Sequence, residues 1–198
     1  FSPDGSKVVY MKQPGSYLTT TLWSKNRGIY LLDIKTKNTK FVIKEGQDPQ
    51  FTPDGKRILL RDNDSDEIKA WYFSVDLSGN DLQKHYSTEL GTEFRVSPDG
   101  KTLAWIENQK LHVTPFIWQS HDTQISPASK HMPVITLSKE SASSISWTKD
   151  SKTVAWGLGD NFYLSSDFDF SQLDPNEEKK DRVVAQTKIG FEVQTNPH

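Results

Sequence analysis

Short runs of β-branched and aromatic residues alternate with polar turns along the whole chain. Four of these runs recur at regular intervals and have the length of strands, at 7–11, 57–61, 102–106 and 153–156. A second run follows each of them after a polar gap, at 28–34, 70–77, 110–116 and 161–165. A weaker third run closes two of the units, at 40–43 and 133–137. Runs of this kind, bounded by turn residues, predict β-strands.

A hydrophobic residue and a Ser/Thr-Pro-Asp-Gly motif precede the first strand of each unit. The hydrophobic residue stands at positions 1, 51, 96 and 147, so the spacings are 50, 45 and 51 residues. The motif residues are Pro3, Asp4 and Gly5, then Pro53, Asp54 and Gly55, then Pro98, Asp99 and Gly100, with only Asp150 kept in the fourth copy. Self-similarity at a period of about 40–50 residues is typical of a blade-by-blade repeat architecture.

The motif is a turn with a physical basis. Proline presets φ, aspartate hydrogen-bonds its own backbone, and glycine adopts a positive φ without a Cβ clash. The fourth copy has Lys149 and Ser151 in place of proline and glycine, so we expect a less rigid turn there. The hydrophobic residues before the later turns, Phe51, Val96 and Trp147, are expected to point into the core between blades.

Counting the strand that leads into each motif, every unit has four strands, which is the content of a propeller blade. The sequence therefore predicts an all-β fold, a partial β-propeller of about four blades of four antiparallel strands. The blades are expected within residues 1–188, in units that start near 1, 46, 90 and 141. Residues 189–198 are expected to form an exit strand or linker toward a following domain. Because residue 1 already lies in a motif, we expect further blades upstream.

Composition narrows the class of function. The net charge is −2, with 24 basic and 26 acidic residues interspersed, which gives no electrostatic case for binding nucleic acid or an anionic membrane. No apolar stretch approaches the roughly 18 residues needed to span a bilayer. The chain has no cysteine, which excludes disulfides and cysteine-ligated metals but leaves the compartment open.

The repeat resembles the TolB-like (WD-type, PD40) propeller repeat, in which a basic residue and a strand follow Ser-Pro-Asp-Gly. The segments 56–59, 101–105 and 152–156 fit this pattern, and 29–33 fits its second-strand signature. The resemblance covers nearly the whole chain. Propellers of this type occur in the TolB translocation protein, in prolyl oligopeptidase-type and tricorn-type proteases, and before certain amidohydrolase domains.

Two segments resemble the propellers of secreted, metal-dependent amidohydrolases more closely: 105–116, which ends in Val-Thr-Pro-Phe, and the tail 188–198. This resemblance implies a non-catalytic propeller of a larger exported hydrolase, located in the bacterial periplasm or secreted. It would act in protein interaction or in access to an active site. The partners would be the remaining blades and a C-terminal catalytic domain that binds a divalent metal, zinc, or other proteins. The alternatives are a TolB-like protein–protein scaffold and the gating propeller of a serine peptidase.

The chain itself shows no catalytic motif. None of its histidines is spaced as His-x-His or His-x₃-His; they are His85, His112, His121, His131 and His198. No Gly-x-Ser-x-Gly nucleophile elbow is present. We therefore expect no catalytic residue and no cofactor in these 198 residues, and surface or strand-face positions for the histidines.

An acidic run is the only candidate for a metal loop. Asp62, Asp64 and Asp66 alternate as in the start of a calcium loop. However, Glu67 stands where such a loop has glycine, and a strand follows at once. The sequence therefore favours a solvated hairpin loop over a calcium site.

Four residues in irregular segments are candidates for a docking surface. Trp23 and Trp118 lie outside the repeat pattern, whereas Trp105, Trp147 and Trp156 hold repeat-equivalent core positions. His121 and His131 lie in an insertion, 118–133, that is longer than an ordinary hairpin loop. Trp23, Trp118, His121 and His131 are therefore the predicted docking residues.

Overall fold

The fold is described from a computed structural model, which covers residues 1–12, 26–64, 69–119, 121–166, 168–172 and 187–190. The chain divides into two compact units. The first comprises Phe1–Phe94 and Ile117–Ile125, and the second comprises Arg95–Phe116 and Ser126–His198. Nearly all described elements are strands, apart from a short 3₁₀ helix, Phe170–Gln172. Over the described ranges, no helix has the length and apolarity needed to cross a membrane.

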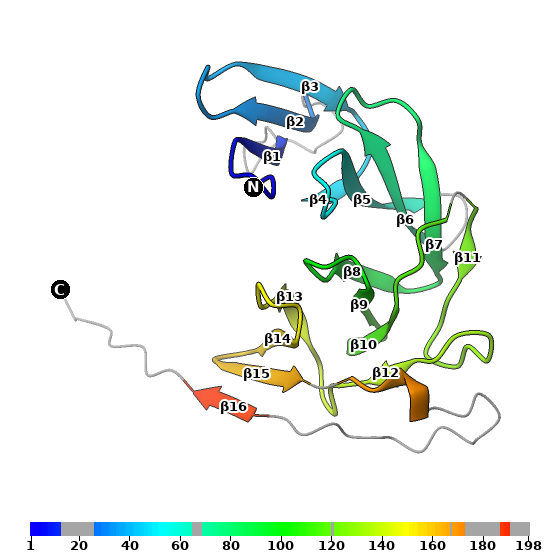
Figure 1. Ribbon diagram of the computed structural model, residues 1–198. Coiled ribbons are helices and arrows are strands. Elements are labelled where there is room, and N and C mark those ends of the chain that lie inside the picture. Colours follow the sequence, from blue (N-terminus) through cyan, green and yellow to red (C-terminus); the bar gives the residue numbers. More distant parts are fainter. Residues whose placement is uncertain (13–25, 65–68, 120, 167, 173–186, 191–198) are drawn as a thin grey trace, which may run out of the picture. The chain divides into compact units, whose positions relative to one another are not determined.

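The first unit contains two sheets (Figure 1). One has the order β1-β2-β3, with antiparallel strands β1 (Lys7–Lys12), β2 (Gly28–Asp33) and β3 (Thr39–Ile43). The other has the order β11-β7-β6-β5-β4. Its strands are β4 (Gln47–Phe51), β5 (Arg57–Asp64), β6 (Lys69–Asp76), β7 (Gln83–Thr88) and β11 (Thr123–Gln124).

Two further sheets complete the described fold (Figure 1). The third sheet has the order β12-β10-β9-β8, from strands β8 (Gly91–Val96), β9 (Thr102–Glu107), β10 (Lys110–Pro115) and β12 (Ile135–Thr136). The boundary between the two units falls within β8. The fourth has the order β13-β14-β15-β16, from β13 (Ser143–Trp147), β14 (Thr153–Leu158), β15 (Asn161–Ser166) and β16 (Thr187–Gly190).

The four sheets correspond to the four sequence repeats. The all-β fold is confirmed, with sheets of three, five, four and four described strands that pair antiparallel except for β11 with β7. The predicted strand runs coincide with observed strands to within a few residues. The sequence reading did not identify β7 or β11. Residues 189 and 190, which we had assigned to the exit segment, pair with β15 as part of β16. The rest of that segment, 191–198, lies outside the described residues.

The repeated turns share one hydrogen-bond network. In all four copies the Ser or Thr hydroxyl donates to the Asp carboxylate, at 2.5–2.6 Å. The same hydroxyl oxygen accepts the main-chain N–H that opens the following strand, at 2.9–3.1 Å. The carboxylate also accepts a main-chain N–H two residues on, at 3.0–3.1 Å. Each turn therefore fixes the end of one strand against the start of the next.

The degraded fourth turn keeps this network. Ser151 has a φ of 63°, close to the 69–73° of the three glycines at the same position. Its hydroxyl also accepts the main-chain N–H of Asp99 at 2.9 Å, so the third and fourth turns touch within the second unit. In the first unit, a Cβ placed on Gly55 would lie 3.3 Å from Pro3 Cδ. Consecutive turns therefore pack against each other in both units.

Alternate strand residues build an apolar core in each unit. The first core contains Ile29, Leu31, Val42, Phe51, Ile58, Leu60, Phe73 and Val75. The second contains Ala104, Ile106, Leu111, Val113, Ile135, Leu137, Ile145, Val154 and Trp156. The expected burial before the turns is confirmed: Phe51 and Val96 are buried, and Trp147 packs partly buried against the second core. Trp105 and Trp156 are fully buried, as their repeat positions predicted.

Replacing Thr52 by valine tests the turn network. Thr52 is 2% exposed, so the lost hydroxyl leaves the main-chain N–H of Arg57 buried without its acceptor. We expect the free energy of unfolding, measured by urea titration, to fall by about 1–3 kcal/mol. Thr148→Val removes the same hydroxyl from an exposed turn, where water can replace it, and should cost less. An equal or larger loss at Thr148 would contradict this account.

Candidate functional site

The structure places the predicted docking residues in different parts of the chain. Trp118, 44% exposed, and His121, also exposed, belong to the first unit, whereas the exposed His131 belongs to the second. Trp23 lies outside the described residues. The docking surface therefore remains a prediction, and of the three candidates that the structure describes, Trp118 and His121 share a compact unit.

The calcium site suggested by Asp62, Asp64 and Asp66 also remains a prediction. Asp62 and Asp64 lie at the end of β5, within the hairpin with β6, and Asp66 is not among the described residues. In the ranges that the structure describes, no three His, Cys, Asp or Glu side chains come close enough to hold a metal ion.

A buried polar chain runs through the second sheet of the first unit. Arg57 Nε donates to Ser74 Oγ at 2.9 Å, and Ser74 Oγ lies 2.9 Å from His85 Nε2. His85 Nδ1 lies 2.5 Å from the main-chain oxygen of Gln119. At the outer end, the Arg57 guanidinium forms an ion pair with Asp81 at 2.5 Å. The pKa of the Asp81 carboxyl is lowered, mainly by this hydrogen bond from Arg57.

These contacts fix the tautomer of the neutral His85 ring. A carbonyl oxygen only accepts, so Nδ1 carries the proton that it donates to Gln119. Nε2 then accepts the hydroxyl proton of Ser74, whose oxygen accepts from Arg57. Burial lowers the pKa of His85; the Gln119 carbonyl partly offsets this effect, and the charge of Arg57 adds to it. His85 is therefore neutral at pH 7.

The Ser74–His85 pair has the hydrogen bond of a nucleophile and its base, but its surroundings do not suit catalysis. The two residues are 0% and 1% exposed, so no substrate reaches the hydroxyl. A catalytic triad directs the second ring nitrogen to a carboxylate, whereas here it meets a main-chain carbonyl. The pair therefore stabilises the fold. Sequence reasoning missed it because no motif connects residues 74 and 85.

A strap, defined here as residues 117–119 and 121–125, contacts this histidine through Trp118 and Gln119. The strap belongs to the first unit, although the residues before and after it belong to the second. Within it, β11 pairs in parallel with β7 and becomes the fifth strand of that sheet (Figure 1). Part of the insertion that the sequence singled out therefore follows a sheet edge and does not project as an open loop.

Side chains of β7 hold the strap at three consecutive positions. Beside the His85 bond, Gln119 Nε2 returns a hydrogen bond to the His85 main-chain oxygen at 3.0 Å. Tyr86 Oη accepts the main-chain N–H of Ile117 at 3.0 Å. Ser87 Oγ donates to the Asp122 carboxylate at 3.0 Å. The Trp118 and His85 rings form a T-shaped pair, with centroids 5.5 Å apart.

A second buried histidine also has a structural role. His112, in β10, is 2% exposed, and its Nε2 lies 3.3 Å from the main-chain oxygen of Glu107. Its Nδ1 lies 3.0 Å from Thr136 Oγ1, and its ring lies 5.2 Å from that of Trp105. Both ring nitrogens are thus engaged inside the second unit.

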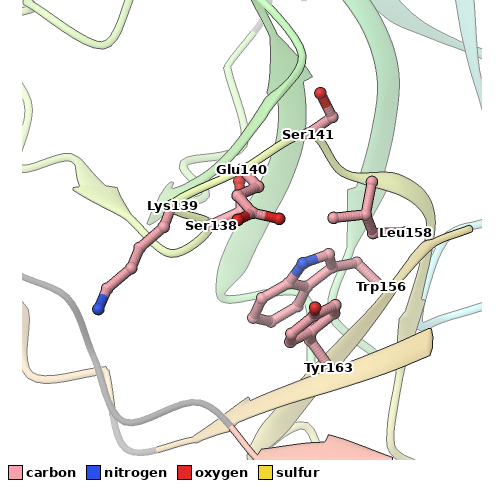
Figure 2. A pocket seen from close by; sticks show the side chains of 7 residues that line it. All are labelled: Ser138, Lys139, Glu140, Ser141, Trp156, Leu158 and Tyr163. Atoms are coloured by element: carbon pink, nitrogen blue, oxygen red, sulfur yellow. The ribbon is translucent and has the colours of Figure 1, made fainter. Parts of the chain in front are cut away.

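A pocket of about 100 Å³ lies in the second unit (Figure 2). Its wall is formed by the stacked rings of Trp156 and Tyr163, 5.7 Å apart, with Leu158 beside them. The carboxylate of Glu140 points toward the rings, and the side chain of Lys139 extends away from them (Figure 2). Since one water occupies roughly 30 Å³, the pocket has room for a few waters or one small side chain.

Sheets of this content, joined by one repeated turn, define a β-propeller domain. Solved structures share the fold: TolB from Acinetobacter baumannii is 20% identical with a TM-score of 0.55, and the match covers 83% of this chain and 38% of TolB. The β-propeller domain of the Trilobed protease from Pyrococcus furiosus is 14% identical with a TM-score of 0.54, covering 96% of this chain and 55% of that one. Kuenenia stuttgartiensis hydrazine synthase is 14% identical with a TM-score of 0.50, covering 83% and 51%.

At these identities the likeness establishes the fold alone, and the fold is that of a partial, TolB-like β-propeller. The chain spans less than two thirds of each of these structures. No protein-family model and no curated protein matches the sequence.

The buried Ser74–His85 pair predicts a negative result in a labelling experiment. A fluorophosphonate probe reacts with serines that a neighbouring base activates in an open site, and Ser74 is fully buried. We expect no adduct on the folded 198-residue chain by intact mass spectrometry. A serine hydrolase of known activity serves as the positive control. An adduct that disappears in Ser74→Ala would overturn the structural role of the pair.

Proposed function

We propose that the chain is the non-catalytic propeller domain of a larger exported amidohydrolase-type hydrolase, acting in protein interaction or in access to the active site. The observation that supports a larger parent propeller is an aromatic sheet face in the first unit, which a further blade would cover. The link to amidohydrolases rests on the resemblance of segments 105–116 and 188–198, and the exported location rests on the same resemblance.

The aromatic face lies on the first sheet. Tyr10 is paired with Tyr30 and Tyr30 with Phe41 across the three strands, so the three rings form a row on one face. Tyr10 and Tyr30 stack with centroids 5.8 Å apart, and Tyr30 meets Phe41 edge-on at 5.5 Å. The core of the unit is built by the alternate residues, among them Ile29 and Leu31.

Among the described residues, the rings of this row are at least partly exposed. Phe41 is 49% exposed, and Tyr10 and Tyr30 are half-buried. The Lys12 ammonium lies 5.6 Å from the Tyr30 ring centroid at the margin of the row. In a propeller, one sheet face packs on the next blade, and the chain spans only 38% and 55% of two solved structures with this fold. A further blade of the parent propeller is therefore the occupant that we propose for the face.

The proposed parent enzyme would bind a divalent metal, zinc, in its catalytic domain. The histidines described in this chain do not fit that role. His85 and His112 are buried with both ring nitrogens engaged, and His121 and His131 belong to different units. The metal would therefore be held by residues outside these 198, and this chain would contribute no ligand to it.

The function is tested by comparing the chain with its parent protein. We expect the purified 198-residue chain, supplied with Zn²⁺, to hydrolyse none of a panel of amide and peptide substrates. The parent protein should hydrolyse at least one of these substrates, and a metal chelator should abolish that activity. Zinc-dependent turnover by the chain alone would contradict the proposal. A parent sequence without a His-x-His motif would also contradict it. A Gly-x-Ser-x-Gly elbow after His198 would instead indicate the serine peptidase alternative. A stop codon there would indicate the protein–protein scaffold.

Hydroxyl-radical footprinting tests the aromatic face. In the parent protein a docked blade would bury the row, so we expect Phe41 and Tyr30 to be oxidised several-fold more slowly than in the 198-residue chain. Leu82 and Leu90, which are about half exposed and lie outside the row, are internal controls and should react equally in both. Equal oxidation of Phe41 in the two proteins would show that no blade covers this face.

A further inference from the structure

The third and fourth repeats hold a buried tryptophan at the same point of their sheets. Trp105 pairs with His112 across β9 and β10, and Trp156 pairs with Tyr163 across β14 and β15. The ring centroids of the two pairs lie 5.2 Å and 5.7 Å apart. The two indoles are 0% and 1% exposed. The two repeats can therefore be compared residue by residue around this ring.

The third repeat provides an acceptor for its indole N–H, whereas the fourth repeat does not. Two residues after Trp105, the Glu107 carboxylate accepts the indole N–H at 3.3 Å. The equivalent residue after Trp156 is Leu158, whose side chain has no acceptor. Among the residues that the structure describes, none accepts the Trp156 indole N–H. A buried donor without a partner is costly, so it points to a ligand or water that supplies the acceptor.

The pocket of Figure 2 lies beside this donor. Trp156 and Leu158 form part of its wall, and the indole nitrogen is on the ring edge that faces the Glu140 carboxylate (Figure 2). Within the described ranges, that carboxylate has no hydrogen-bond donor and no ion-pair partner. Ser138 Oγ, also in the lining and 4% exposed, accepts the Leu111 main-chain N–H at 2.8 Å, and no described residue accepts its proton. The described lining therefore combines buried donors, a carboxylate and an aromatic wall.

We propose that this pocket binds a primary carboxamide, from a small free amide or from the side chain of an asparagine or glutamine. The carbonyl oxygen accepts from the Trp156 indole, the amide N–H donates to Glu140, and the planar group lies against the rings. The volume of about 100 Å³, room for about three waters, suits a group of this size. The pocket residues all belong to the second unit, so the inference does not depend on the proposed function.

Other small groups match this lining less well. An ammonium or guanidinium group only donates, so the Trp156 indole N–H would still lack an acceptor. A carboxylate would accept from the indole, but it would face the like charge of Glu140. A hydroxyl group can accept and donate, but it has one oxygen for both contacts and no flat face to place against the rings. A primary amide has an acceptor, a donor and a flat face.

NMR titration of the intact 198-residue chain with acetamide tests the pocket. The chain has six tryptophans, and NOE contacts with the Tyr163 ring assign the indole signal of Trp156. This N–H gains an acceptor on binding, so its ¹H signal should move downfield and saturate at millimolar concentrations, because so small a ligand binds weakly. The indole signal of Trp105, already bound to Glu107, should not move. If the Trp156 signal shows no saturable shift, the proposal is wrong.

Related probes separate the amide from other ligands. Methylammonium keeps only donors and N,N-dimethylacetamide keeps only the acceptor, so each should bind at least about fivefold more weakly than acetamide. Methylammonium or ethanol that binds as tightly as acetamide would overturn the assignment. A glutamine peptide with acetyl and N-methylamide ends distinguishes the two sources. If it shifts the Trp156 signal, the ligand is a side-chain amide; if acetamide alone does so, it is a small free amide.

Two variants test the residues that would hold the amide. Glu140→Ala should weaken acetamide binding by about tenfold, since one hydrogen bond to a charged group is lost. Leu158→Gln places a carboxamide of the chain itself beside the indole, so it should move the Trp156 signal downfield without ligand and abolish the response to acetamide. Glu45→Ala, which removes an exposed carboxylate from the first unit, is the matched control and should bind as the wild type does. Wild-type affinity in Glu140→Ala would contradict the proposal.

Discussion

The hydrogen bonds of the four repeated turns are the constraint on which the sheets depend. In each turn a Ser or Thr hydroxyl is bound at once to a carboxylate and to the first N–H of the next strand. This fixes the residue at which the strand begins. A shift of one residue would turn every side chain to the opposite face, so that Ile58 and Leu60 would leave the core. The turns therefore determine which residues build each core.

The same constraint explains why the fold could be predicted from the sequence. The motif and the strand after it are contiguous, and each repeat carries the same local information. The buried positions of Phe51, Trp105 and Trp156 follow from their place relative to the turn. The network of the fourth turn shows which part of the motif matters most: Asp150 and Thr148 preserve it without proline or glycine. The hydroxyl and the carboxylate are therefore common to all four turns, whereas the fourth turn lacks the proline and the glycine.

The features that the sequence did not reveal depend on pairing between distant residues. β7 mixes polar and aromatic residues, and β11 is too short for any periodicity. Ser74 and His85 meet because the register of β6 and β7 shifts beside Tyr72, and no residue pattern marks that irregularity. The sequence did identify the insertion as unusual, from its length alone. Only the structure shows that part of the insertion pairs with the edge of β7, a strand some 35 residues earlier in the chain.

The strap also covers part of a sheet edge that would otherwise be open. Without β11, the outer edge of β7 would present unpaired main-chain groups, which invite pairing with other chains. Two ladder residues cover part of this edge, and the polar side chains of β7 provide further bonds to the strap. Because the cover is short, protection of the edge depends on the side-chain bonds from His85, Tyr86 and Ser87 as well as on the ladder.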